Sequence, residues 1–401
     1  MSLHRIGSRS ALSVLVAGVL VAACSQAPTP SGFGGPAGGS GSSGSSGGGG
    51  GSGSSSGSGV GNFGGSSSGS SSSGTSGTGP VDVTPSCDPG LAIDDTHAAS
   101  FAKAIGICTE VSSGGWGLVS ATYSNAFGST SPPADGQSGL VPQFGTAIAP
   151  REGARIGVLS SGYARNYDDM VGSNQGQNSD FVASGGGPRD GTSYPTGQAP
   201  PGFPEAAKGC PQDNLVNDMI DVKLVLKAPP DATGFSFDFD FYSSEWPNYV
   251  CSNFNDAFVA YLTSSATTGN ISFDSNKNPV AVNIDFFNRC TPGASIGCLR
   301  SNGPNPDPPL SKASCSAGPS ELDGTGFGDT DQTQCDSGNT QATLGGSTGW
   351  LTTTASIQPG EQFTLEFMIW DAGDGLLDSS VLLDHFQWIG GQVSTGTTRV
   401  Q

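Results

Sequence analysis

Apolar and polar residues alternate along several short segments of this chain. The clearest case is residues 235–242, where Phe occupies every second position and Ser, Asp or Tyr occupies the positions between. A period of two places the Phe side chains on one buried face of a strand, so Asp238 and Asp240 are expected on its solvated face. Further strands are expected at 219–226, 257–262, 280–287, 363–370 and 379–388.

One segment has the period of a helix instead. Residues 98–105 carry apolar side chains at helical spacing, Asp94 or Asp95 can cap the first turn, and Gly106 is expected to end the helix. Gly-, Pro- and Asn-rich connections, some of them long, separate the predicted strands. We therefore predict an all-β fold: an antiparallel β-sandwich, jelly-roll-like, with long loops and one short N-terminal helix.

The amino terminus has the pattern of an export signal. An apolar run at 11–23 follows basic residues and is about half the ~20 residues that a spanning helix needs. It ends in Ala-Ala before Cys24 and so resembles the bacterial lipobox, whose Cys carries a diacylglycerol, with palmitate as the acyl group. We predict that residues 1–23 are a lipoprotein signal peptide and that Cys24 is lipidated. The alternative is an ordinary signal peptide with an incidental Cys.

The residue after the lipobox bears on the destination of the protein. Ser25 follows Cys24, not Asp, so the resemblance favours the outer membrane if the host has two membranes. Residues 31–80 are mostly Gly and Ser, and such a stretch has too little apolar surface to offset its ordering entropy. We predict a disordered linker at 24–86, a folded domain at 87–389 and a C-terminal tail at 390–401.

The composition is strongly acidic. There are 34 Asp and Glu against 15 Lys and Arg, for a formal net charge of −19. This balance argues against nucleic acid as a partner, because phosphate binding needs a basic face. It also argues against adsorption onto anionic lipid, so the lipid on Cys24 is the expected link to the membrane. An acidic surface of this kind attracts cations.

Eight cysteines remain after Cys24, an even number that indicates four disulfides in an exported chain. The sequence does not fix their pairing. Closure of short loops favours three pairs and leaves a fourth: Cys87–Cys108, Cys290–Cys298, Cys315–Cys335 and Cys210–Cys251. A zinc site is disfavoured, because there is no C-x-x-C and only His97 and His385 lie outside the leader.

A wider pattern runs through six segments in a fixed order: Phe237–Val250, Phe254–Phe258, Gly324–Phe327, Gly349–Leu351, Pro359–Glu361 and Ile369–Asp384. Together they resemble the choice-of-anchor L domain, over roughly Cys87 to Ile389. The resemblance implies a β-rich surface or secreted domain on exported bacterial proteins whose attachment device varies. It implies no established enzymatic activity.

An acidic loop inside this pattern is the best candidate for chemistry. Asp371, Asp374 and Asp378 fall between two predicted strands, with glycines among them, and Asp384 lies further along the second strand. Tight glycine-containing backbone lets several oxygens converge on one point. Ca²⁺ takes about six to eight oxygen ligands from carboxylates and carbonyls, so the loop predicts a Ca²⁺ site.

A second acidic turn contributes further candidates. Glu245 and Asp256 are expected to complete this metal site or to form another. The competing interpretation is that Asp and Gly are simply common in turns, and that Glu245 and Asp256 accept backbone hydrogen bonds. Trp246 and Tyr249 lie in the same turn, where exposed aromatic rings would stack on a sugar.

Catalysis has little support in the sequence. His97 and His385 are the neutral bases outside the leader, and no local motif surrounds either. The glutamates that might form a glycosidase pair have no distinguishing context. We therefore expect no enzyme, but a Ca²⁺-stabilised binding or adhesion module on the bacterial envelope, with surface polysaccharide or an envelope protein as partner. An envelope glycan hydrolase and a structural surface-coat component remain the alternatives.

Overall fold

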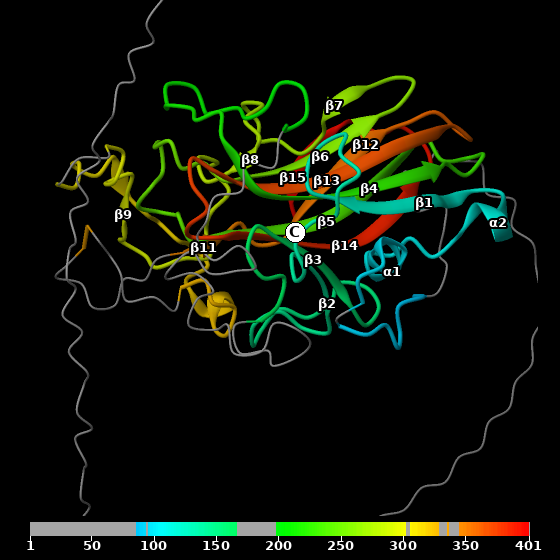
Figure 1. Cartoon of the computed structure of the whole chain (residues 1–401), viewed down its shortest axis with the longest axis horizontal. Coiled ribbons are helices and arrows are strands. Elements are labelled where there is room, and N and C mark those ends of the chain that lie inside the picture. Colours follow the sequence, from blue (N-terminus) through cyan, green and yellow to red (C-terminus); the bar gives the residue numbers. More distant parts are fainter. Residues whose placement is uncertain are drawn as a thin grey trace, which may run out of the picture. The chain divides into compact units, whose positions relative to one another are not determined.

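The alternating segments of the sequence form the strands of two facing antiparallel sheets. The computed structural model describes residues 86–93, 95–166, 198–301, 305–328, 335–336 and 345–400, all within one compact unit. The predicted signal peptide, Cys24 and the linker up to residue 85 lie outside the described residues. Figure 1 shows the two sheets as layers, and the predicted all-β sandwich is confirmed.

The first layer, sheet I, has six strands. Along the sheet the order is β1 (Gly117–Ser124), β4 (Val216–Lys227), β13 (Gln362–Ala372), β6 (Ala257–Thr263) and β7 (Thr268–Asn270), and β8 (Val280–Ala281) also pairs with β6. β13 lies at the centre, between β4 and β6, so its backbone is paired along both edges.

The second layer, sheet II, has seven strands. Their order is β15 (Gly396–Arg399), β12 (Leu351–Ser356), β5 (Gly234–Ser243), β14 (Ser379–Ile389), β3 (Ile156–Ser160) and β2 (Ser138–Val141), with β11 (Gly346–Ser347) also paired to β5. A separate pair joins β9 (Ser295–Ile296) to β10 (Ser311–Lys312). The smaller elements are α1 (Ala98–Ala104), α2 (Val111–Gly114) and the 3₁₀ turn at Ser320–Leu322.

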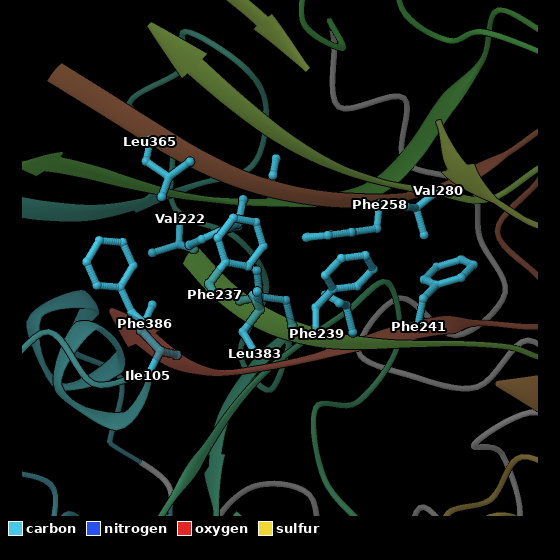
Figure 2. Close-up of a cluster of buried hydrophobic side chains, with 14 of the residues drawn as sticks. Ile105, Val222, Phe237, Phe239, Phe241, Phe258, Val280, Leu365, Leu383 and Phe386 are labelled. Atoms are coloured by element: carbon cyan, nitrogen blue, oxygen red, sulfur yellow. The ribbon is translucent and has the colours of Figure 1, made fainter. Parts of the chain in front are cut away.

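The Phe face of β5 fills the space between the sheets. Phe237, Phe239 and Phe241 point toward residues of β4, β6 and β13 (Figure 2). The ring of Phe237 lies 4.9 Å from that of Phe367, and Phe239 lies 5.1 Å from Phe258. Interlocked aromatic pairs of this kind add to the free energy gained from burying their surface. This packing holds the two sheets in register.

The other face of β5 is covered as well, which the alternation of the sequence does not indicate. Asp238 is 2% exposed and Asp240 is fully buried, so the prediction that they are solvated is wrong. Loop residues Phe144, Leu322 and Phe327 form a second apolar cluster over this face of sheet II. The outer face of sheet I is covered in the same way by a third cluster, which includes Ala126, Phe127, Ala199 and Phe203.

Several boundaries differ from those expected. The strand predicted at 280–287 is only two residues long, and the predicted C-terminal tail contains β15, which pairs with β12 at the edge of sheet II. Strands β1, β2, β3 and β12 were not predicted. α1 has His97 as its N-cap and not the predicted Asp94 or Asp95. Gly106 follows the helix, as expected, and the one-turn helix α2 is additional.

The structure contains the four disulfides that the sequence predicts, and two of the four predicted pairs are correct. Cys87–Cys108 and Cys210–Cys251 form as predicted. The other four cysteines pair as Cys290–Cys315 and Cys298–Cys335, so the two predicted short loops are wrong. Cys290 and Cys298 lie on either side of β9, and each bonds to a cysteine later in the chain. The two disulfides therefore cross-link the long 290–335 connection at two places.

Replacing Phe237 by Ala should lower the free energy of unfolding by about 3–5 kcal/mol, because it leaves a cavity between the sheets. Chemical denaturation measures the loss. Val119→Ala is the control, since Val119 is 43% exposed on β1 and should change stability by less than about 0.5 kcal/mol. Equal losses in the two variants would contradict the packing described here.

Candidate functional site

Five buried carboxylates gather where strands of both sheets end. Asp218 lies in β4 and Asp371 near the end of β13, whereas Asp378 immediately precedes β14 of sheet II. Glu245 and Asp256 stand at the two ends of the connection between β5 and β6. None of the five is more than 2% exposed.

Strand register brings these segments together. Asp371 pairs with Asn217 across β13 and β4, after a bulge that follows Ile369. In sheet II, Ser379 at the start of β14 pairs with Ser243 at the end of β5. The end of β13, the start of β14 and the end of β5 therefore meet at one end of the sandwich.

Asp256 is the best satisfied carboxylate of the group. Its Oδ1 accepts a hydrogen bond from the Ala372 amide at 3.0 Å, and its Oδ2 accepts one from the Ser379 hydroxyl at 2.6 Å. The side chain thereby ties β13 of sheet I to β14 of sheet II. Burial raises its pKa to about 7, although these hydrogen bonds act in the opposite direction.

Glu245 lies beside Asp256. Its Oε2 accepts a hydrogen bond from the Asp256 amide at 3.4 Å. Burial, and then the charge of Asp256, raise the pKa of Glu245 well above its ordinary value. The sequence also allowed that Glu245 and Asp256 accept backbone hydrogen bonds, and both do. They still belong to the acidic cluster, because their carboxyl groups act on one another.

Asp371 and Asp378 are less well satisfied. Among the described residues, neither Oδ atom of Asp371 nor Oδ2 of Asp378 has a donor at hydrogen-bond distance. The Ser161 hydroxyl donates to the Ser379 carbonyl at 3.2 Å, and its interaction with Asp371 acts to lower the pKa of that carboxyl. Burial and neighbouring carboxylates raise the pKa of both side chains well above the usual range.

Asp374 lies at the margin of the cluster. It is partly buried, its Oδ1 accepts a hydrogen bond from the Leu376 amide at 3.0 Å, and its carbonyl accepts one from the Asn217 side chain at 2.9 Å. These are the contacts of an ordinary turn residue. Its charge nevertheless contributes to the raised pKa of Glu245.

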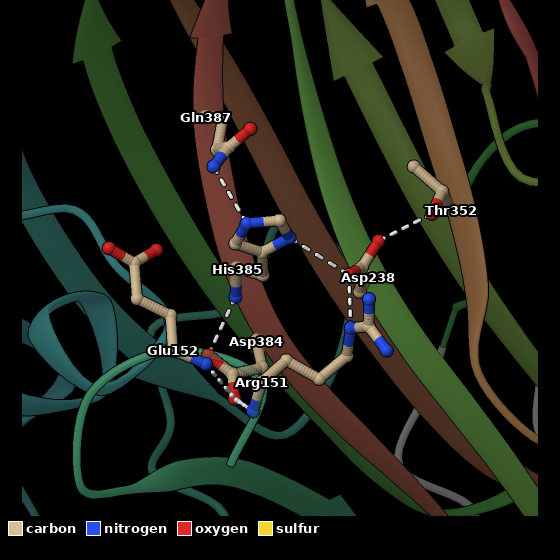
Figure 3. Close-up of polar contacts among 7 residues, drawn as sticks. All are labelled: Arg151, Glu152, Asp238, Thr352, Asp384, His385 and Gln387. Carbon is tan, nitrogen blue, oxygen red and sulfur yellow. Dashed lines mark hydrogen bonds and ion pairs between the residues drawn. The ribbon is translucent and has the colours of Figure 1, made fainter. Parts of the chain in front are cut away.

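Asp384 does not belong to the cluster, contrary to the sequence-based expectation. It lies five residues beyond Ser379 along β14, about 16 Å for an extended strand. Its Oδ2 accepts a hydrogen bond from the Arg151 amide at 2.7 Å, and its Oδ1 accepts one from the His385 amide at 2.6 Å (Figure 3). Burial raises its pKa to about 7.

The neighbouring polar network explains why Asp238 is tolerated inside. Asp238 Oδ2 contacts His385 Nδ1 at 3.0 Å and Arg151 Nε at 2.6 Å (Figure 3). The Asp238 hydrogen bond raises the pKa of His385. The other ring nitrogen of His385 lies 2.7 Å from the Gln387 amide nitrogen. Both nitrogens are thus engaged by side chains that are not nucleophiles, and nothing here resembles a Ser-His-Asp arrangement.

The predicted aromatic contacts are also placed differently. Trp246 is only 4% exposed and stacks on Phe287 with ring centroids 5.1 Å apart, so an exposed sugar platform at Trp246 is wrong. Tyr249 is partly buried and meets Phe254 edge-on at 5.4 Å. His97, the other candidate base, has a largely exposed side chain hydrogen-bonded to Asp95.

Asp218 is the member of the cluster that sequence reasoning missed. It is 1% exposed and has a positive φ of 51° within β4. The sequence did contain a sign of this role: Asp218 lies in a largely apolar strand. Burying a charged carboxylate costs free energy unless it has a partner. Ser161, which follows β3, was missed as well because β3 was not predicted.

The side chains as they stand form no ready metal centre. Within the part of the chain that the structure describes, no group of three or more His, Cys, Asp or Glu is arranged to hold a metal ion. None of the described helices is long and apolar enough to cross a membrane. What the cluster offers is a set of buried oxygens that need protons or a cation to balance their charge.

Buried carboxylates outside the cluster predict a falling stability with rising pH. Burial raises the pKa of Asp221 to about 8 and those of Asp240 and Asp384 to about 7. The folded state therefore keeps protons that the unfolded chain loses near pH 4, so this stabilisation disappears as pH rises through about 7 to 8.

Denaturation midpoints measured in EDTA from pH 5.5 to pH 8.5 should accordingly decrease. Asp221→Asn should make the midpoint fall less with pH. Asp231→Asn, at an exposed position, should leave the fall in midpoint unchanged. A midpoint that rises across this range would show that these carboxyl groups ionise normally in the folded protein.

Comparison with known proteins finds a family model that matches part of the sandwich. Residues 222–387 match the family model of the choice-of-anchor L domain, a narrower span than the resemblance suggested. The match covers β5 to β13, the second half of β4 and most of β14, together with Glu245, Asp256, Asp371 and Asp378. No curated protein and no solved structure matches the chain. Over these residues, which make up less than half of its length, the chain is similar to the choice-of-anchor L domain.

Proposed function

We propose that this chain is an exported envelope protein, anchored by a lipid on Cys24, whose sandwich is a Ca²⁺-stabilised binding module without catalytic turnover. The family match supports a surface-associated protein. Four disulfides support an oxidising compartment, because such bonds persist outside the reducing cytosol. Surface polysaccharide or another envelope protein is the proposed partner.

The buried acidic cluster is the observation that carries the proposal. Several carboxylates within one dry region repel one another, and removing each of them from water costs free energy. A divalent cation offsets both costs, and carboxylate and carbonyl oxygens are the ligands that Ca²⁺ prefers. Because the cluster contains residues of both sheets, a bound ion would act as a clamp between them.

The proposal that the module has no catalytic turnover rests on the contacts of its two histidines. His385 is held between Asp238 and Gln387, and His97 pairs with Asp95 at a helix start. Among the described residues, neither histidine has a hydroxyl or thiol in its hydrogen-bond contacts. A Ser or Cys nucleophile activated by histidine requires such a contact. These contacts favour a binding module over the hydrolase.

Calcium should raise the thermal stability of the protein. Ligand present at ~100 times its dissociation constant stabilises a folded state by about 2.7 kcal/mol, which corresponds to a rise in Tm of about 5–10 °C for a domain of this size. Thermal melts in CaCl₂ and in EDTA measure the difference. Identical midpoints in the two conditions would remove Ca²⁺ from the proposal.

The lipid anchor is tested in cells. Cys24→Ala should move the protein from the membrane pellet to the soluble fraction, because the sulfur that carries the lipid is gone. Ser25→Ala is the matched control and should leave the protein in the pellet. Retention of the Cys24→Ala protein in the pellet would contradict lipid anchoring.

A further inference from the structure

We propose that a cleft beside β9 and β10 binds an extended peptide that carries an apolar side chain and, within two positions of it, a lysine or arginine. The cleft has a volume of about 370 Å³, which lies within the range of pockets that bind small ligands. The peptide site rests on the proposed function, since it takes the sandwich as a binding module, and it names the class of partner. It involves neither the proposed Ca²⁺ nor the acidic cluster.

Two segments of the chain form the walls of the cleft. One wall consists of residues 282–285 and 287, which follow β8, and the other consists of residues 310–314, which contain β10. The disulfide Cys290–Cys315 joins the chain just beyond the first wall to the residue directly after the second. This cross-link fixes the two walls relative to each other, so less conformational freedom is lost when a ligand binds.

The interior of the cleft is mainly apolar. The stacked rings of Trp246 and Phe287 line it and are 4% and 8% exposed. Aliphatic side chains line the rest of the apolar surface: Val250, Val282, Ile284, Ile296 and Leu310. Leu310 is 49% exposed. An apolar side chain in the cleft would remove part of this surface from water, which contributes free energy to binding.

Asn283 supplies a hydrogen-bond donor that is not in use. Its Oδ1 accepts a hydrogen bond from the Cys251 amide at 2.5 Å, and its backbone amide donates to Asn255 Oδ1 at 3.1 Å. Among the described residues, Asn283 Nδ2 is buried and has no acceptor, a state that costs free energy. Because Asn283 lines the cleft, a main-chain carbonyl oxygen of a bound peptide can satisfy it.

The charge at the cleft favours a basic partner. Asp285 lines the cleft and is exposed. Lys312, the cationic side chain among the described lining residues, is already paired with Asp336 at 2.8 Å. The chain as a whole has a formal net charge of −19. A lysine or arginine of the partner is therefore attracted to Asp285, whereas an acidic partner is repelled.

An extended peptide offers these contacts together, whereas a polysaccharide does not. The side chains of a peptide supply the apolar group and the cation, and its main chain supplies the carbonyl oxygen. A sugar ring stacks on an open aromatic face, and the rings of Trp246 and Phe287 are nearly covered. The cleft therefore favours the protein partner over the polysaccharide.

Selection from a library of random linear peptides on the full-length protein tests the site. The selection is carried out in EDTA, so that its result does not depend on Ca²⁺. We expect the enriched peptides to share an apolar residue with a lysine or arginine within two positions of it. The enriched peptide of highest affinity, labelled with fluorescein, is then the probe for binding measurements by fluorescence polarisation.

Two pairs of variants locate the binding. Leu310→Ser removes apolar surface from the cleft without adding charge, and it should weaken binding of the labelled peptide by at least about fivefold. Leu215→Ser is its matched control, because Leu215 is 51% exposed outside the cleft. Asp285→Asn should weaken binding by about two- to fivefold, and by less at high salt. Asp231→Asn makes the same change of net charge at another exposed position and should leave the affinity unchanged. Thermal melts show that each variant is folded.

The outcomes separate the peptide site from the rest of the proposed function. No enriched peptide, or equal affinity in the unaltered protein and Leu310→Ser, would overturn the site. Basic peptides without a shared apolar residue, weakened equally by Asp285→Asn and Asp231→Asn, would indicate attraction by net charge and would also overturn it. Polysaccharide binding that is lost in Leu310→Ser would assign the cleft to a glycan instead. Each of these results leaves the lipid anchor and the Ca²⁺ stabilisation standing, and a Tm that does not respond to Ca²⁺ leaves the peptide site standing.

Discussion

The cost of placing carboxylates where two sheets close on one another governs the candidate site. An ionised carboxylate away from water must find donors, a proton or a cation. Asp256 finds donors on both sheets, and Asp238 finds Arg151, Thr352 and His385. Asp371 finds none. The difference between these residues, more than the number of acids, is what points to a bound ion.

The sandwich supplies the rigidity that this arrangement requires. The Phe rings of β5 interlock with those of sheet I, and apolar loop residues cover both outer faces. Disulfides fasten the long connections, including the one from Cys210 to Cys251 beside the β5–β6 turn. Carboxylates at the end of such a frame cannot move apart easily to reach solvent. Their mutual repulsion is therefore retained in the folded protein.

Local patterns predicted the parts of the fold that depend on near neighbours. The alternation at 235–242 identified β5 and its buried Phe face, and the spacing at 98–105 identified α1. The same alternation was wrong for Asp238 and Asp240, because their cover comes from loops near residues 144 and 322–327. The disulfide partners Cys298 and Cys335 are likewise set by the folded path of a long connection, which sequence distance does not reveal.

The acidic site shows the same limit. Asp371, Asp378, Glu245 and Asp256 were identified because they flank strands, and strand register then brings them together. Asp384 was included because it follows in sequence, yet continued extension along β14 carries it to Arg151. Asp218 was missed because its closeness to Asp371 arises from the pairing of β4 with β13, across more than a hundred residues.

A crystal structure of the protein grown with CaCl₂, with an anomalous difference map, tests the central claim most directly. We predict one peak within the buried acidic cluster, with carboxylate oxygens at about 2.3–2.6 Å from it. A map with no peak among these residues, and with their carboxyl groups hydrogen-bonded to one another as shared-proton pairs, would contradict the account.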